Sequence, residues 1–243
     1  MSGDLLVVEG LSRRFRGLLA VDAVDLTVES GQVHGLIGPN GAGKTTLFNL
    51  LSGLTPPDAG RVRLDGAALD GLPSWRRTRA GLARTFQNIR LFAEMTVFEN
   101  VLTGFHSRRL PARAAGERGM ALLDLVGLAG AAQQRAGGLS YGDQRRLEIA
   151  RAMAAEPKLL MLDEPAAGMN PSETHALVDL LRRLGVTLLV VEHDMRLVMR
   201  LCDRITVLNF GRKIAEGTPA QIRSDPAVIE AYLGAKLARG LAS

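Results

Sequence analysis

One glycine-rich segment, Gly38-Pro39-Asn40-Gly41-Ala42-Gly43-Lys44-Thr45, constrains the fold of this 243-residue chain more than any other part of the sequence. It matches G-x-x-x-x-G-K-[ST] in full, follows the apolar run 33–37 and leads into a helical pattern over 44–51. Such glycines let backbone N–H groups turn inward around phosphate oxygens, while the lysine reaches the β- and γ-phosphates and the threonine hydroxyl ligates Mg²⁺. The helix that follows directs its positive N-terminal end at the same anion. This strand–loop–helix context predicts an ATP-binding phosphate loop.

A second apolar run ends in two carboxylates. Leu159-Leu160-Met161-Leu162 precedes Asp163 and Glu164. An acid in this place after a buried strand is expected to bind the nucleotide's Mg²⁺, and we assign this role to Asp163. Glu164, one residue later, is placed to polarise the attacking water as a general base. Alone, adjacent acids after a strand indicate no more than a polar turn, and only the phosphate loop gives the pair its meaning.

The hydrophobic pattern predicts an α/β core interrupted by a helical insert. Period-two and continuous apolar runs indicate strands in the first and last thirds of the chain, whereas the middle, from about Thr96 to Glu156, is rich in Ala, Leu and Arg and reads as helical. The strands are expected at 5–8, 24–28, 33–37, 61–64, 158–162 and 186–191, with a hairpin over 205–215. Ser172–Leu184 is expected to be helical, and Thr218 to cap a short helix beginning at Pro219.

Composition excludes some classes of protein. Only 4% of residues are aromatic, which leaves little material for a base-stacking surface, so no nucleic-acid partner is expected. The single cysteine, Cys202, lies in an apolar stretch and is expected to be a buried, inert thiol. The net charge of +5 comes mainly from arginine and is interpreted as a solvated surface. Neither a signal peptide nor a membrane-spanning stretch is expected.

Further along the chain, Leu139-Ser140-Tyr141-Gly142-Asp143-Gln144-Arg145-Arg146 resembles the signature motif of the ATP-binding cassette (ABC) ATPases. The order of phosphate loop, signature, acidic strand and then His193 resembles that family from about Leu5 to Gly234. The resemblance implies a P-loop NTPase (RecA-like) core with an antiparallel β subdomain and an inserted α-helical subdomain. The corresponding boundaries are a single ABC ATPase domain with its core at about 1–87 and 158–234, a helical subdomain at about 88–157 and a tail at 235–243.

The resemblance also implies roles for single residues. Phe15 is similar to the aromatic residue that stacks on adenine, and His193 to the switch histidine that contacts the γ-phosphate. Gln87 is similar to the glutamine that meets Mg²⁺ and the attacking water. The expected catalytic residues are thus Glu164, His193 and Gln87, and the expected metal ligands are Thr45, Gln87 and Asp163. Nucleotide contacts are expected from Phe15, Gly38, Pro39, Asn40, Gly41, Ala42, Gly43, Lys44, Thr45, Thr46, Ser140 and Gly142.

In this family two cassettes face head to tail, so Ser140 and Gly142 are expected to serve the ATP of the other subunit. A serine hydroxyl at a helix N-terminus suits a γ-phosphate. The signature carries Asp143 where a neutral amide is common, and we expect this carboxylate to face solvent or a basic neighbour such as Arg146.

The segments Ala83–Phe92, Met95–Asn100, Leu162–Pro171 and Val228–Gly234 resemble the cassettes of branched-chain amino acid importers. The resemblance implies ATP and Mg²⁺ as cofactors and a second ABC ATPase subunit, in a homo- or heterodimer, as partner. Integral membrane permease subunits would bind a groove near 87–100, and a substrate-binding protein would act indirectly. The chain is expected at the cytoplasmic face of the inner (plasma) membrane as a peripheral subunit. Alternatives are a cassette for urea or lipopolysaccharide, or a soluble ATPase of iron–sulphur assembly.

Overall fold

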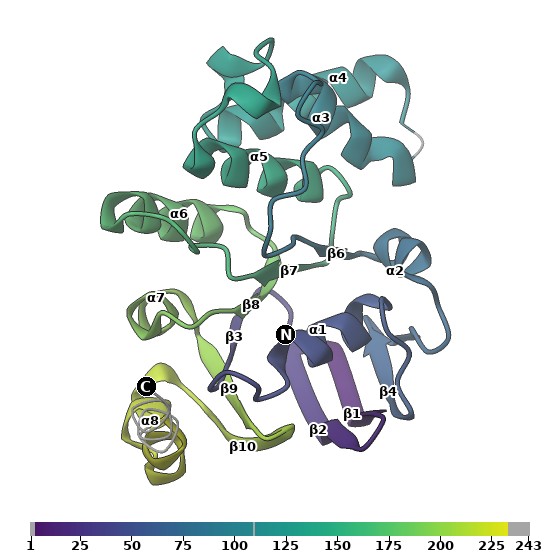
Figure 1. The fold of residues 1–243 in the computed structure, drawn as a ribbon. Coiled ribbons are helices and arrows are strands. Elements are labelled where there is room, and N and C mark those ends of the chain that lie inside the picture. The colour runs from purple at the N-terminus through teal and green to yellow at the C-terminus, as the bar shows by residue number, and fades with distance from the viewer. Residues whose placement is uncertain (1–2, 109, 233–243) are drawn as a thin grey trace. The chain divides into compact units, whose positions relative to one another are not determined.

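The computed structural model describes residues 3–108 and 110–232. The chain folds into two compact units. The first consists of residues before Trp75 together with those from Thr187 onward, and the second of Trp75–Val186. Helices and strands are labelled as in Figure 1.

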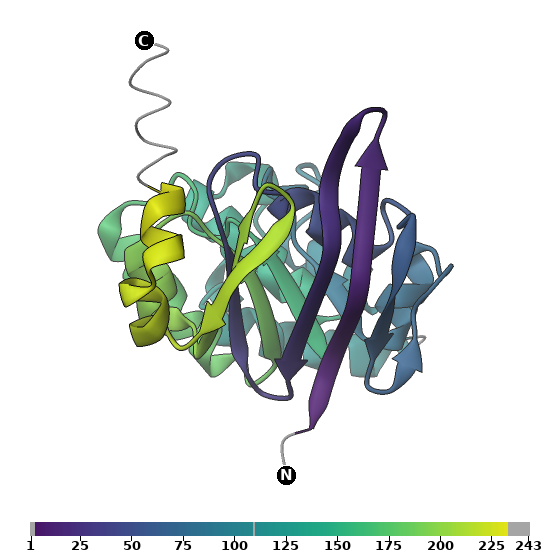
Figure 2. The ribbon, with the colours of Figure 1, turned by 90° about the horizontal axis from the view of Figure 1, so that it is seen from below.

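The first unit contains an antiparallel sheet in the order β2-β1-β4-β5. Its strands are β1 (Asp4–Phe15), β2 (Leu18–Glu29), β4 (Ala59–Leu64) and β5 (Ala67–Ala68). In β1 and β2 buried positions are interspersed with half-exposed or exposed ones, so the sheet covers a core on one face. Figure 2 shows β1 and β2, in purple, running side by side over their length. β1 ends at Phe15, and this end of the strand belongs to the site described below.

The other strands of the first unit are ordered β10-β9-β3-β8, with β3 (Val33–Ile37) parallel to both of its neighbours. They are β8 (Thr187–Val191), β9 (Arg204–Asn209) and β10 (Arg212–Gly217). Every residue of β3 and β8 is buried, as expected of parallel strands. Its helices are α1 (Lys44–Ser52), α7 (Met195–Leu201) and α8 (Pro219–Ser224). As predicted, α1 begins at Lys44 and Thr218 caps α8; Gly53, in the left-handed conformation, ends α1.

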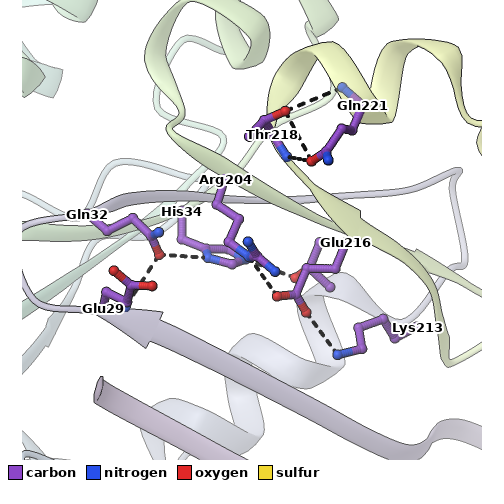
Figure 3. Close-up of polar contacts among 9 residues, drawn as sticks. Glu29, Gln32, His34, Arg204, Lys213, Glu216, Thr218 and Gln221 are labelled. Atoms are coloured by element: carbon purple, nitrogen blue, oxygen red, sulfur yellow. Dashed lines mark hydrogen bonds and ion pairs between the residues drawn. The ribbon is translucent and has the colours of Figure 1, made fainter. Parts of the chain in front are cut away.

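A polar cluster lies inside this unit, next to the strand that leads to the glycine-rich loop (Figure 3). The His34 ring on β3 is fully buried; its Nδ1 lies 3.2 Å from Gln32 Oε1 and its Nε2 2.9 Å from Thr206 Oγ1. Because an amide oxygen only accepts, Nδ1 donates and Nε2 accepts from the threonine. Burial lowers the pKa of His34 from 6.5 to about 4. The histidine is therefore a neutral structural residue at physiological pH.

The second unit pairs β6 (Leu82–Arg84) in parallel with β7 (Leu159–Asp163) and carries most of the helices. They are α2 (Ser74–Ala80), α3 (Val97–Gly104), α4 (Ala112–Leu125), α5 (Tyr141–Met153) and α6 (Pro171–Arg183), with short 3₁₀ turns at Phe105–Ser107, Ala129–Ala131 and Ala136–Gly138. Helices α3, α4 and α5 pack on one another, in teal and green in Figure 1. The helical pattern predicted for the middle of the chain is confirmed, and Gly137 and Gly138 lie in the last 3₁₀ turn. The predicted tail 235–243 lies outside the described residues.

Candidate functional site

The glycine-rich loop joins β3 to α1, and two of its glycines cannot be replaced without strain. Gly38 has φ +152, and a Cβ there would lie 2.2 Å from the carbonyl oxygen of Leu208. Gly43 has φ +100, and its Cβ would lie 2.5 Å from the carbonyl oxygen of Ala20. The loop backbone is thus pressed against β9 and β2, at positions that only glycine fits.

Helix α1 begins without a side-chain cap. Its N-cap is Gly43, no side chain accepts a hydrogen bond there, and its first turn carries no acidic residue. The first N–H groups of a helix have no partner within the helix, so this end concentrates partial positive charge and free donors. Such an end is suited to hold a phosphate.

Lys44 adds a full positive charge at this end of α1. The side chain is buried, and Nζ donates to the carbonyl oxygens of Gly38 (2.7 Å) and Pro39 (3.0 Å). The ammonium group therefore contacts the backbone of the same loop that would bind the phosphate. Thr45 in the first turn is exposed and Thr46 is half-buried, so the Thr45 hydroxyl is accessible from solvent.

A pocket of about 340 Å³ opens beside this loop, within the first unit. Residues 41–46 line one part of it, and Phe15 at the end of β1 lies in its wall with 43% of its surface exposed. Loop and aromatic residue, predicted separately from the sequence, thus share one pocket. Phe210, 84% exposed with φ +45 between β9 and β10, lines the same pocket and was not foreseen. An exposed phenylalanine in a tight turn was the signal that could have identified it.

Tyr232 is a second residue that the sequence did not single out for the site. Its hydroxyl is buried and has no hydrogen-bond partner among the described residues. Burial raises the pKa of Tyr232 to about 12, and the backbone of Gly38 opposes this rise. The phenol therefore lies against the first glycine of the loop, in an approach that falls short of hydrogen-bond geometry.

His193 follows β8 in the first unit. Its side chain is 64% exposed, and Nδ1 lies 3.8 Å from the buried carboxylate of Glu192. The next residue, Asp194, caps α7 by accepting from the N–H groups of Arg196 and Leu197. The histidine is thus held at the end of a buried strand, with its ring accessible.

In the second unit the structure brings Gln87 and Glu164 together. Gln87 Nε2 donates to Glu164 Oε2 at 2.8 Å. Glu164 has φ +46, a left-handed conformation that costs a non-glycine residue free energy and that tends to occur at functional sites. The structure therefore joins two of the three predicted catalytic side chains and shows backbone strain at one of them.

Asp163, the last residue of β7, is buried and paired. Arg84 Nη2 donates to Asp163 Oδ2 at 2.8 Å, with only 8% and 7% of the two side chains exposed. The arginine supplies the opposite charge that a buried carboxylate requires. This partner on the neighbouring strand β6 was not predicted.

Arg145 anchors α5 to the segment that carries Gln87. Its fully buried guanidinium donates to the carbonyl oxygens of Phe86 (2.7 Å) and Gln87 (2.8 Å) and pairs with Glu148 at 2.7 Å. Burial raises the pKa of Glu148, and the charge of Arg145 opposes this rise. The backbone on either side of the Gln87 peptide is thus fixed by one charged side chain.

The N-terminus of α5 carries Ser140 and Gly142. Ser140 is the N-cap, and its Oγ accepts from the Asp143 N–H at 3.2 Å and donates to Asp143 Oδ2 at 2.9 Å. The other carboxylate oxygen, Oδ1, is bonded to Arg146. The expectation that Asp143 faces Arg146 is confirmed.

The predicted ligands suit Mg²⁺ by their chemistry. A threonine hydroxyl, an amide oxygen and a carboxylate are the hard oxygen donors that this ion prefers. In the described part of the chain no three His, Cys, Asp or Glu side chains gather into a metal cluster, so Asp163 would act with neutral donors and the nucleotide's own oxygens.

Comparisons with known proteins identify the family of the chain. A family model described as ABC transporter matches residues 21–167, more than half of the chain. The chain belongs to the ABC transporter family. It is an ATPase of that family, as the order of its motifs predicted, and the resemblance to ABC cassettes in the sequence is confirmed. A second model, described as branched-chain amino acid ATP-binding cassette transporter, matches residues 212–238.

Among curated relatives, the high-affinity branched-chain amino acid transport ATP-binding protein BraF of Pseudomonas aeruginosa is 51% identical over 253 residues, covering 96% of this chain and 99% of BraF. Among solved structures, the ADP conformation of an ABC transporter cassette has a TM-score of 0.86 at 31% identity, covering 96% of this chain and 99% of that one. A cassette solved as a dimer in a post-hydrolysis state with ADP and Pi has a TM-score of 0.79 at 25% identity, covering 88% and 99%. The α/β cassette fold is thereby confirmed. No helix in the described ranges has the length and apolar character needed to span a bilayer.

Proposed function

We propose that the chain hydrolyses ATP as a head-to-tail dimer to drive the import of branched-chain amino acids. The observation that carries the substrate class is its 51% identity to BraF over nearly the whole of both chains, and a C-terminal match to the branched-chain cassette model supports it. Neither finding favours the alternatives from the sequence, a cassette for urea or lipopolysaccharide or an iron–sulphur assembly ATPase.

In the first unit, the open end of α1 and Lys44 bind the β- and γ-phosphates, with backbone N–H groups of residues 38–46 around them. Phe15 stacks on the adenine. His193 contacts the γ-phosphate. The shared pocket of Phe15 and the loop supports the first two roles.

In the second unit, Glu164 polarises the attacking water and Gln87 orients it. Their hydrogen bond supports this pairing, because it holds the base and the amide side by side. Thr45 of the first unit and Gln87 and Asp163 of the second would supply oxygen ligands to Mg²⁺, which would neutralise charge on the phosphate oxygens. Ser140 and Gly142 contact the γ-phosphate bound by the other cassette, and the dimer solved for a related cassette supports this arrangement.

A hollow of about 500 Å³ in the second unit is the site that we assign to a permease helix. Trp75 and Phe92, each 53% exposed, contribute aromatic walls. The guanidinium of Arg79 lies 5.0 Å from the Trp75 ring, and that of Arg151 lies 5.7 Å from the Phe92 ring. Aromatic faces beside cations suit a short helix with apolar and acidic side chains. The cassette then lies at the cytoplasmic face of the membrane, with a substrate-binding protein acting indirectly and no nucleic-acid partner.

Replacing Glu164 with Gln tests the hydrolytic part. We expect Glu164→Gln to bind ATP normally, to lose turnover and to accumulate as a dimer, measured by phosphate release and by light scattering after size exclusion. Turnover at the normal rate would show that the base is another residue. For the transport part, copurification from native membranes should yield polytopic subunits and a second cassette; exclusively soluble partners would contradict it.

A further inference from the structure

The signature serine of the free chain is already engaged by its own helix. A hydroxyl group has one proton, and that of Ser140 is donated to Asp143 Oδ2 at 2.9 Å. Ser140 Oγ also accepts from the Asp143 N–H, so Ser140 and Asp143 are bonded in both directions. Ser140 is exposed and accessible to a phosphate, but its proton is committed.

The acidic side chains at the N-terminus of α5 also make this end unfavourable for binding an anion. Asp143 lies in the first turn, where its carboxylate offsets the partial positive charge of the helix end. Glu173 lies close by, since a Cβ on Gly142 would be 3.3 Å from Glu173 Oε1. Arg146 pairs with Asp143, but the Asp143 side chain keeps 27% of its surface exposed. A γ-phosphate arriving here would meet negative charge and a serine without a free proton.

We propose that Asp143 is a positioning residue that restrains Ser140 and thereby raises the ATP concentration at which two cassettes close. Closure requires the Ser140 hydroxyl to stop donating its hydrogen bond to the Asp143 carboxylate and to donate it to a γ-phosphate oxygen instead, while Arg146 stays paired with the released carboxylate. The bonds between Ser140 and Asp143 compete with the contact between the signature and the nucleotide. The dimer therefore forms only when the contacts with the phosphate are more favourable than these bonds. This inference rests on the head-to-tail dimer proposed above.

A purely structural role for Asp143 predicts the opposite sign. An acid at this position stabilises the helix N-terminus, so its loss would weaken α5 and with it dimer formation. The restraint predicts that losing the charge makes the dimer form more easily. The direction of the change therefore separates the two roles.

The test uses Asp143→Asn and Asp143→Gln, each in the Glu164→Gln background that traps the dimer. Dimer fraction is measured by light scattering against ATP concentration, at low and at high ionic strength. We expect half-maximal dimerisation at about three- to tenfold less ATP than the parent needs, the size expected when one unit charge is removed beside a multiply charged anion in a partly solvated site. The gain should shrink at high ionic strength because salt screens the charge.

Two controls isolate the effect. Asp143→Glu keeps the charge and should show no gain. Glu117→Gln removes one exposed negative charge from α4, where it pairs with Arg113, and should also leave the midpoint unchanged. Binding of a fluorescent ATP analogue to the monomer should be the same in every variant, because Lys44 and the loop are untouched.

The failures are distinguishable. If the Glu164→Gln parent stays monomeric at saturating ATP, the proposed dimer is wrong and the inference falls with it. If the parent dimerises but both neutral variants need as much ATP or more, only the role of Asp143 is overturned. Thermal melting of each variant identifies any that has not folded, and the other neutral variant then decides.

Discussion

Two helices, α1 after the phosphate loop and α5 at the signature motif, have contrasting N-termini. Helix α1 has a glycine as its N-cap, no side-chain cap, no acid in its first turn and a buried lysine, Lys44, as its first residue. Helix α5 starts at Ser140, which is bonded to an acid in its first turn. One end is open to an anion and the other is occupied by the chain's own carboxylate.

The difference indicates the order of events. The α1 end is prepared by backbone geometry, so nucleotide binds there without rearrangement of a capping side chain. The α5 end has to exchange one acceptor for another before it contacts phosphate. Under the proposed function, a free cassette binds ATP first and the signature engages second, at a cost set by Asp143.

The largest expected effect concerns what holds the α5 end in place. Arg145→Met leaves Glu148 as an unpaired buried charge and removes the donors to the Phe86 and Gln87 carbonyls. We expect a loss of about 3–5 kcal/mol in the free energy of unfolding, measured in urea. Arg145→Met combined with Glu148→Leu should recover part of it, because no charge is then left unpaired. A single variant as stable as the parent would show that α5 is held by packing alone.

Lys44→Ala removes the charge from the open end. We expect ATP affinity to fall about a hundred- to a thousandfold, or roughly 3–4 kcal/mol, because a buried cation no longer meets the phosphates. A fluorescent nucleotide titration measures this. Lys213→Ala, which removes a charge paired with Glu216 in the same unit, is the control and should bind normally. Equal affinities for Lys44→Ala and the control would show that backbone donors suffice.

The sequence predicted the open end better than the occupied one. Glycines 38 and 43 are required by local backbone geometry, and the strand before them and the helix after them follow from the hydrophobic pattern, so loop, strand and helix were predicted from one continuous segment. Phe15, far from the loop in sequence, was assigned only through family resemblance. Its pocket depends on the long pairing of β1 with β2, which a local pattern does not specify.

The remaining contacts join distant positions or depend on side-chain rotamers. Arg84 with Asp163 and Arg145 with the Phe86 carbonyl join residues 79 and 59 positions apart. Tyr232 against Gly38 spans nearly the whole chain. The pairing of Asp143 with Arg146, within one helical turn, was one of the two surroundings expected for this carboxylate, whereas the bond from Ser140 to Asp143 depends on the rotamers of both residues.

Two buried titratable residues, one in each unit, predict opposite changes of folding stability with pH. His34 on β3, before the α1 loop, has its pKa lowered to about 4, so the unfolded chain binds more protons between pH 6.5 and 4 and acid destabilises the first unit. At about 1.4 kcal/mol per pH unit, the protonation of His34 lowers the free energy of unfolding by about 3 kcal/mol at pH 4. Glu148 in α5 has its pKa raised above 4.5, so its contribution is present below 4.5 and is lost as pH rises through the raised value.

Urea unfolding of His34→Gln and the parent from pH 7 to pH 4 measures the first slope. We expect the variant to lose less stability on acidification than the parent, because Gln cannot take up a proton. His175→Gln, on α6 of the second unit, is the matched control and should keep the parent's slope. Identical slopes for His34→Gln and the parent would show that acid acts on other groups.

The smallest expected effect concerns a side-chain hydroxyl beside the glycine-rich loop. It tests whether the loop depends on any side-chain hydrogen bond. Tyr232→Phe removes a buried hydroxyl that has no partner among the described residues and keeps the ring against Gly38. Removing an unsatisfied buried hydroxyl should leave stability unchanged or raise it by up to about 1 kcal/mol, with ATP affinity changed less than about threefold. Tyr141→Phe is the control at the other end, since its hydroxyl accepts from Arg145 at 3.3 Å and its loss should cost stability. If Tyr232→Phe weakens ATP binding by more than about threefold, the N-terminus of α1 also relies on a side-chain hydrogen bond. Backbone geometry alone would not transmit the loss of one oxygen atom to the nucleotide.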